Sequence, residues 1–324
     1  MEASSKSKES NQLIPQLEAE GLQSTESVTL WKTAWRRLFR RKSAVVGMVI
    51  LALLILIAIF APVLAPYDPY KVLIGVEQVK MRQAPCIHIL GCPTDQPQHI
   101  MGLDGNVRDQ FSRLLYGARL SLMVGLSTVS FAIVIGTVLG ALAGYMGKWV
   151  DNVIMRIMDV LLAFPTLLLA IAIVSILGPG LINALLAIAI VSIPAYARVV
   201  RSSVLTVREM EFVEASRSLG GSPFYILFSR ILPNSLTPLI VQGTLGIATA
   251  ILDAAALSFL GLGAQPPTPE WGTMLGAERN QVFTAPHLVF YPGLAIMVTV
   301  LAFNLLGDGM RDALDPRLAM QSSE

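Results

Sequence analysis

Long runs of apolar residues, separated by polar segments, constrain this 324-residue chain more than any other feature. Hydrophobic residues make up 54% of it and charged residues only 14%, whereas soluble domains carry about 25% charged residues. The first run, Ala44 to Leu64, is long enough as a helix to cross a hydrocarbon core of ~30 Å. The chain is therefore predicted to be an all-α integral membrane protein with six transmembrane helices. The predicted spans are residues 44–64, 120–145, 153–177, 181–200, 236–259 and 288–306.

Positive charge indicates the orientation of the spans. Tryptophans, arginines and lysines gather just before Ala44, and such residues anchor a helix at the interface with the cations in the cytoplasm. The N-terminus is thus predicted to be cytoplasmic, and six crossings return the C-terminus to the same side. No secretory signal is evident, so the first run is expected to remain as an anchor. We expect a multi-pass protein of the cell inner (plasma) membrane.

This topology divides the chain into segments. Residues 1–28 are polar and lack periodicity, so we expect them to be disordered. The loop at 261–286 is rich in proline, which predicts a rigid, non-helical cap. The predicted segments are a cytoplasmic tail with the basic collar (1–43), the first span (44–64), an extracytoplasmic loop (65–117), a core with five spans (118–308) that includes the cytoplasmic loop 201–233 and the extracytoplasmic loop 261–286, and a cytoplasmic C-terminal tail (309–324).

Residues 211–238 form a polar segment between two apolar runs, and this segment is the most informative for function. Phe212, Ala215 or Ser216, and Leu219 recur at helical spacing and form one apolar stripe on a short helix. Such a helix is suited to lie in the groove of a partner protein. The alternative is an interfacial helix resting on lipid, although its acidic polar face disfavours anionic lipid.

The residues after this stripe are suited to a turn between two helices. Gly220 and Gly221 can end the first helix in a left-handed conformation. Ser222 can then cap a second helix, with Pro223 in its first turn. The pattern predicts a helix–turn–helix on the cytoplasmic side.

The same residues resemble a known motif. Glu214-Ala215-Ser216, followed by Gly220 and by Ile231-Leu232-Pro233, resembles the EAA loop of ABC importer permeases. The family pattern is Glu-Ala-Ala, three residues, Gly, nine residues, then Ile-x-Leu-Pro. Ser216 stands for the third alanine, and Ile231 falls one place late, so no specific role is assigned to that isoleucine.

Further segments resemble the dipeptide/oligopeptide/nickel branch of this family, in its second permease subunit. They extend the likeness in order over residues 35 to 318, and they imply the fold of a type I ABC importer permease. The segments are residues 60–69, 101–104, 108–109, 112–119, 257–263, 266–269, 304–309 and 311–317.

The resemblance implies a mechanism and a set of partners. Two homologous permease subunits face one another, two ABC ATPase subunits each receive one coupling helix, and an extracytoplasmic substrate-binding protein delivers the cargo. By this resemblance Glu214 makes polar contacts at the ATPase surface, Ala215 permits close approach and Gly220 allows the turn. The predicted ATPase-contact residues are Phe212, Glu214, Ala215, Ser216, Leu219 and Gly220.

The sequence lacks the motifs of a nucleotide-hydrolysing or hydrolytic enzyme. The nearest approach to a phosphate-binding loop, residues 144–149, has the wrong spacing and ends in Trp149 where a hydroxyl is needed. We therefore expect no catalytic residues, no metal and no cofactor in this chain, with ATP and magnesium bound by the partner ATPases. The lipid bilayer is the remaining expected partner, and no nucleic acid is expected.

Two carboxylates fall within predicted spans, Asp159 near the cytoplasmic start of the third and Asp253 within the fifth. Asp253 would cost ~2.5–3.5 kcal/mol on insertion scales if it faced lipid, so it should face protein or water. It is a candidate for lining the translocation pathway, where it could contact the amino terminus of a peptide. The alternative is a hydrogen bond between helices.

Prolines and cysteines suggest local features. Pro165 and Pro194 are expected to interrupt their helices, as static kinks or as hinges. Cys86 and Cys92 lie in the predicted extracytoplasmic loop, where a disulfide is natural. Free thiols and a metal site are the alternatives, although the spacing is not a standard zinc pattern.

The sequence is thus interpreted as the permease subunit of an ATP-driven importer, with dipeptides or oligopeptides as cargo. Nickel uptake is an alternative within the same family. An ATP-independent secondary carrier is an alternative of another class, and it would often show inverted repeats or broken helices around a midplane site.

Overall fold

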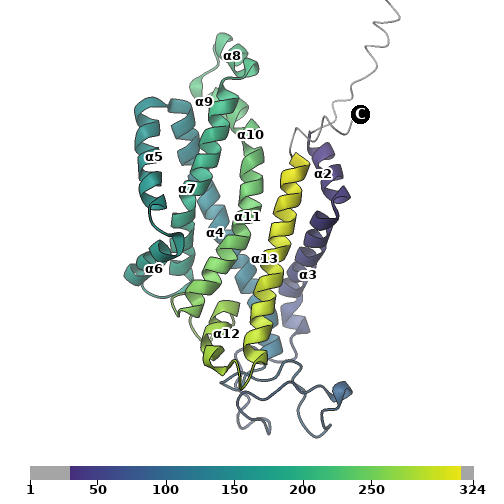
Figure 1. The fold of residues 1–324 in the computed structure, drawn as a ribbon. Coiled ribbons are helices and arrows are strands. Elements are labelled where there is room, and N and C mark those ends of the chain that lie inside the picture. The colour runs from purple at the N-terminus through teal and green to yellow at the C-terminus, as the bar shows by residue number, and fades with distance from the viewer. Residues whose placement is uncertain (1–29, 315–324) are drawn as a thin grey trace, which may run out of the picture.

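The computed structural model describes residues 30–314, and this part of the chain is all-helical apart from isolated β-bridges. The predicted disordered residues 1–28 and the end of the predicted C-terminal tail lie outside it. Long helices run roughly alongside one another, and shorter helices cover the two ends of the bundle (Figure 1). The helices are α2 (Leu30–Arg40), α3 (Lys42–Leu64), α4 (Gln110–Met146), α5 (Lys148–Leu162), α6 (Thr166–Leu177), α7 (Leu181–Arg208), α8 (Glu211–Ser218), α9 (Pro223–Tyr225), α10 (Leu232–Asn234), α11 (Leu236–Phe259), α12 (Trp271–Glu278) and α13 (His287–Leu314), with the short 3-10 helices η1 (His88–Leu90) and η3 (Arg279–Gln281) and the π-helix η2 (Ile226–Ile231).

Five of these helices, α3, α4, α7, α11 and α13, are long and apolar enough to cross a membrane. The third predicted span, residues 153–177, is not one continuous helix. It is formed by α5 and α6, which meet at an angle of 91° and make a sixth span if the bent pair is counted as one. Pro165 stands directly before α6 with extended backbone, and a proline disfavours helical conformation in the residue before it.

Two other expectations about proline are wrong. Pro194 does not interrupt its helix, because α7 continues through it from Leu181 to Arg208 and buries its ring. The loop at 261–286 is not wholly non-helical, because it contains α12. Three of the four prolines of that loop precede Glu270, whose carboxylate accepts hydrogen bonds from the backbone N–H groups of Gly272 and Thr273 and so caps α12.

The core of the bundle is the contact between α4 and α7. Small residues of α4 face α7 and allow the two backbones to approach closely. A Cβ atom added at Gly136 would lie 2.7 Å from the Cβ atom of Tyr196, and one added at Gly144 would lie 2.9 Å from a methyl group of Val204. A Cβ atom at Gly140, between them, would overlap the backbone oxygen of Ala197. The glycine stripe of this helix is therefore a packing surface.

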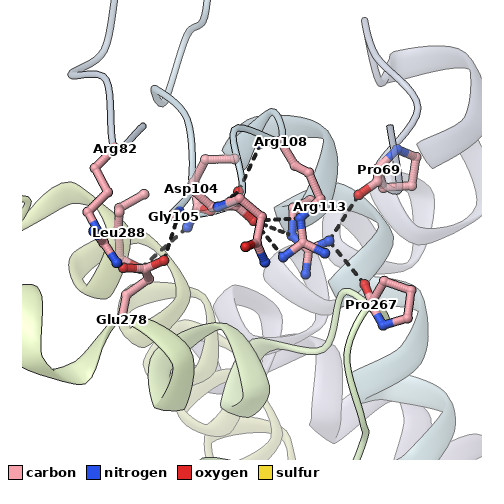
Figure 2. A network of polar contacts seen from close by, with 11 residues as sticks. Pro69, Arg82, Asp104, Gly105, Arg108, Arg113, Pro267, Glu278 and Leu288 are labelled. Carbon is pink, nitrogen blue, oxygen red and sulfur yellow. Dashed lines mark hydrogen bonds and ion pairs between the residues drawn. The ribbon is translucent and has the colours of Figure 1, made fainter. Parts of the chain in front are cut away.

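The two predicted extracytoplasmic loops join into one unit at the end of the bundle that carries α12. Figure 2 shows the polar contacts that connect them, which we call the outer network. The buried carboxylate of Glu278 accepts a hydrogen bond from the Gly105 backbone N–H at 2.8 Å and pairs with Arg82 at 2.9 Å. Arg113, also buried, donates to the backbone oxygens of Pro69 and Pro267.

The outer network also explains why α4 begins ten residues before the predicted span. Asp109 caps the helix by accepting hydrogen bonds from the backbone N–H and the hydroxyl of Ser112. Arg113, in the first turns of α4, lies 3.4 Å from the carboxylate of Asp104. The polar residues at the start of α4 thus belong to the helix. Their charges are paired with groups of the loop, so they do not lie unpaired in an apolar environment.

Candidate functional site

The segment around α8 lies at the opposite end of the bundle from α12, as Figure 1 shows, and at the same end as α2. Helix α8 is anchored by Val213, which is fully buried and belongs to the same hydrophobic cluster as Ile226, Leu227 and Ile231. Its acidic residues lie in the first turn and Arg217 in the last, which suits the helix dipole. The helix is therefore held against η2 by its apolar side.

The predicted stripe lies on the outer side of α8. Phe212 is 40% exposed and Leu219 88% exposed. Glu214 and Ala215 are also exposed, and Ser216 is half-buried with its hydroxyl bonded to the backbone oxygen of Phe212 at 2.8 Å. The sequence pattern found the surface residues correctly as a group but missed Val213, which attaches the helix to the rest of the molecule.

The turn after α8 has the form that the glycine pair predicts. Gly220 has a φ of +79°, in the left-handed region, and nothing lies within 4 Å of the place where a Cβ atom would be. The backbone N–H of Gly221 donates to the oxygen of Ser216. Ser222 then caps α9 by accepting from the N–H of Tyr225, and Pro223 occupies its first turn.

Three aromatic residues extend this exposed surface beyond the predicted stripe. Phe224 is 75% exposed, Phe228 59% and Tyr225 49%. The guanidinium of Arg230 lies over the Tyr225 ring, 5.6 Å from its centroid, and donates to its hydroxyl at 3.2 Å. The spacing of Phe224 and Phe228, four residues apart after a helix-starting proline, was a signal that could have identified them. Ile231, by contrast, is fully buried, so it is a core residue.

The cysteines lie near the other end of the bundle. Cys86 and Cys92 form a disulfide with their Cα atoms 5.4 Å apart. The buried ring of His99 contacts the carboxylates of Asp109 and Glu77 at 2.9 and 3.3 Å. Within residues 30–314, no group of three or more metal-binding side chains is placed to hold an ion.

Asp253 lies in α11 and is half-buried. Its carboxylate has no hydrogen-bond or ion-pair partner among residues 30–314, so the helix–helix hydrogen bond that was the alternative reading is not found there. Asp159, the other carboxylate at depth in a predicted span, does have a partner, since it pairs with Arg198 of α7 at 2.5 Å. The two carboxylates therefore differ in a way that the sequence did not reveal.

A groove of about 600 Å³ lies between α11, α12 and α13, and Asp253 borders it without being one of its lining residues. Its walls are almost wholly apolar, with one amide among the lining side chains. The lining includes Leu252, Ala256, Phe259, Met297, Val300 and Asn304. Leu252 precedes Asp253 in the chain, and Ala256 lies one turn further along α11.

Comparison with known proteins identifies the family. Residues 136–320 match the model of the binding-protein-dependent transport system inner membrane component, and residues 29–85 match the N-terminal transmembrane domain of oligopeptide transport permease C. The chain is 50% identical over 292 residues to the dipeptide transport system permease protein DppC of Alkalihalophilus pseudofirmus, covering 90% of this chain and 91% of that protein. It is 47% identical over 290 residues to the glutathione transport system permease protein GsiD of Pectobacterium atrosepticum, covering 90% and 92%.

A solved structure shares the fold. It is an inward-facing form of the MetNI methionine ABC transporter, which aligns with a TM-score of 0.53 at 20% sequence identity over 63% of this chain and 96% of that one. The described helices therefore have the fold of a type I ABC importer permease. The chain belongs to the family of binding-protein-dependent transport system inner membrane components.

Proposed function

We propose that this chain is a transmembrane permease subunit of an ATP-driven importer and forms half of the translocation pathway for dipeptides or oligopeptides. The observation that carries the proposal is the 50% identity to a dipeptide transport permease over nine-tenths of this chain. The peptide transport named for that relative favours peptide cargo over nickel. Membership of a binding-protein-dependent family argues against a carrier that works without ATP.

The surface around α8 is the proposed contact with the ATPase. Its exposed residues are apolar or acidic, it lies at the end of the molecule beyond α5 and α7, and Val213 ties it to η2 and to the core. A movement of α8 would therefore be transmitted to the membrane spans through packed side chains and not through a flexible linker. Phe224, Tyr225 and Phe228 enlarge the proposed contact beyond the predicted Phe212, Glu214, Ala215, Ser216, Leu219 and Gly220.

The remaining partners follow from this assignment. A homologous second permease subunit would complete the pathway, two ABC ATPases would bind ATP and magnesium, and an extracytoplasmic binding protein would deliver the peptide. This chain itself would catalyse no reaction. The α8 surface and both termini would be cytoplasmic, and residues 65–117 and 261–286 would face outward, in the cell inner membrane.

Reconstitution tests the proposal. The chain is incorporated into proteoliposomes with a homologous second permease and two ABC ATPases, and uptake of a radiolabelled dipeptide is measured with the binding protein outside and ATP inside. Uptake should require both ATP and the binding protein. Uptake by this chain alone, or uptake of nickel but not of peptide under the same conditions, would contradict the proposal.

A further inference from the structure

One face of α11 carries polar side chains at membrane depth and is partly open, although the hydroxyl of Tyr196 covers it at Gly246. Gln242, Thr249 and Asp253 recur at intervals of seven and four residues, which places them on one side of the helix. Thr249 is exposed, and Gln242 and Asp253 are partly exposed. The hydroxyl of Thr249 bonds back to its own helix, at Leu245. No hydrogen bond within residues 30–314 satisfies the amide of Gln242 or the carboxylate of Asp253.

The groove next to this face adds a third unpaired polar group. Asn304 of α13 is exposed, lines the groove together with Leu252 and Ala256, and has no side-chain hydrogen-bond partner in the described part of the chain. A mostly apolar hollow with a few unpaired polar groups at its edge is the usual composition of a site for a small molecule. The opposite side of α11 is closed, because its small residues, such as Ala250 and Ala254, are buried in the core.

Asp253 lies well inside the span. It is 17 residues from the start of α11 at Leu236, which corresponds to about 25 Å along the helix axis, and six residues from its end at Phe259, about 9 Å. A carboxylate at that depth is costly against lipid, and no cation of residues 30–314 pairs with it. It must therefore meet water, a partner subunit or a positively charged ligand. The proposed cargo supplies such a charge, because a peptide carries an ammonium group at its amino terminus.

We propose that Asp253 binds the amino terminus of the transported peptide as it passes along the open face of α11, with Asn304 as a hydrogen-bonding partner for the peptide backbone. The carboxylate would compensate the ammonium as it passes the edge of the apolar groove, which a neutral side chain cannot do. The inference rests on the proposed peptide cargo. It makes Asp253 a residue that contacts substrate and sets the preference for a free amino terminus.

Substitutions at Asp253 distinguish a role of its negative charge from a role of its size and hydrogen bonding. Asp253→Asn keeps the size and the hydrogen-bonding capacity but removes the charge, and Asp253→Glu keeps the charge. We expect dipeptide uptake in the proteoliposomes to fall about tenfold or more in Asp253→Asn, since a hydrogen bond to a charged group is lost, and to be largely retained in Asp253→Glu. Asp95→Asn, the same chemical change at an exposed site in the outer loop, should transport at the wild-type rate.

Thiol labelling tests access without relying on transport. The chain has two cysteines, both in the disulfide, so Asp253→Cys introduces the only free thiol. In the assembled transporter a positively charged methanethiosulfonate reagent should modify this thiol, and saturating peptide with binding protein should slow the modification several-fold. Leu252→Cys is a neighbouring position on the groove wall and should be protected in parallel.

The outcomes are separable. An unreactive thiol at 253 would mean that lipid or the second permease subunit covers this position, and a reactive thiol that peptide does not protect would mean that the carboxylate meets only water. Either result overturns the inference, as does wild-type uptake by Asp253→Asn. The proposed function stands or fails on its own, because wild-type uptake of the dipeptide is measured in the same vesicles.

Discussion

Single residues decide whether the α8 surface can transmit a movement. Val213 has no exposed surface and holds α8 on the core, whereas Leu219, six residues later, is almost fully exposed. Gly220 then turns the chain in a conformation that other residues adopt only at a cost. Attachment of α8 to the core, the exposed apolar surface and the turn after the helix thus depend on Val213, Leu219 and Gly220 respectively. Each of these residues can be changed without altering the other two.

At this scale we predict that Gly220→Val and Glu214→Lys uncouple ATP hydrolysis from uptake. Valine in the left-handed region costs ~1–3 kcal/mol, so the turn should rearrange locally; the lysine reverses a charge on the exposed side of α8. In proteoliposomes we expect peptide uptake to drop at least about fivefold, which corresponds to ~1 kcal/mol, with membrane insertion unchanged.

Gly75→Val provides the matched control. Gly75 has a φ of +76° and, like Gly220, has nothing within 4 Å of the place of a Cβ atom, but it lies in the loop at the other end of the molecule. The same backbone cost should therefore leave coupling intact. Normal uptake in both Gly220→Val and Glu214→Lys would contradict a coupling role for this turn.

At the scale of elements, the bundle combines a rigid pair of helices with a broken one. Helices α4 and α7 approach closely through glycine, while α5 is attached to α7 by ion pairs, including Asp151 with Arg201 at 2.6 Å. Asp151 and Arg201 lie toward the α8 end of their helices, whereas Asp159, which pairs with Arg198, lies three residues before the other end of α5. The bend at Pro165 then directs α6 away from the axis of α5. Close packing holds α4 against α7, and ion pairs hold α5, the first half of the bent span, against α7.

We predict that Gly140→Leu destabilises the molecule by disturbing the contact between α4 and α7. A side chain there would enter the backbone of α7 at Ala197, and overpacking of this kind costs ~1–3 kcal/mol or more. The midpoint of thermal unfolding in detergent, followed by fluorescence-detected gel filtration, should fall by several degrees.

Val134→Leu places the same leucine side chain on an exposed position of the same helix and should leave the midpoint unchanged. An equal effect of Gly140→Leu and Val134→Leu would mean that added bulk anywhere on α4 is responsible, and not the close approach to α7.

At the scale of the whole molecule, the outer network joins parts of the chain that are far apart in sequence. The Glu278 carboxylate bonds to Gly105, 173 residues away, and Arg113 reaches Pro267, 154 residues away. The segment after α3 and the segment before α13 therefore form a single cap over one end of the bundle (Figure 2). Such a cap offers an external partner a preformed surface, with little ordering of loops on binding.

We predict that Glu278→Ala loosens this cap. The buried N–H of Gly105 and the guanidinium of Arg82 both lose their acceptor, and an unsatisfied buried group costs ~1–3 kcal/mol. Hydrogen exchange over residues 79–109 should become faster, as measured by mass spectrometry. Glu278→Gln retains an oxygen for Gly105 and should show a smaller effect; unchanged exchange in Glu278→Ala would show that other contacts hold the cap.

Some of this structure could be predicted because its signals are local. Apolar runs identified the spans, and the order Gly220-Gly221-Ser222-Pro223 predicted both the end of α8 and the cap of α9, because the backbone preference of each residue acts within one turn. The sequence predicted that the helix is interrupted at Pro165, but it did not predict the angle between α5 and α6. A proline indicates a weak point in a helix, but the 91° angle depends on where α6 can pack.

The sequence by itself determined that the chain is an all-helical membrane protein with a short helix and a glycine turn between two of its spans, because periodicity and turn chemistry are properties of neighbouring residues. Only the tertiary structure decided that Val213 is the anchor of α8, that Glu278 and Gly105 meet, and that Asp159 has a cation partner while Asp253 has none among the described residues 30–314. Whether a polar group is satisfied depends on which distant residues the fold brings within about 3 Å of it, and no local pattern contains that information.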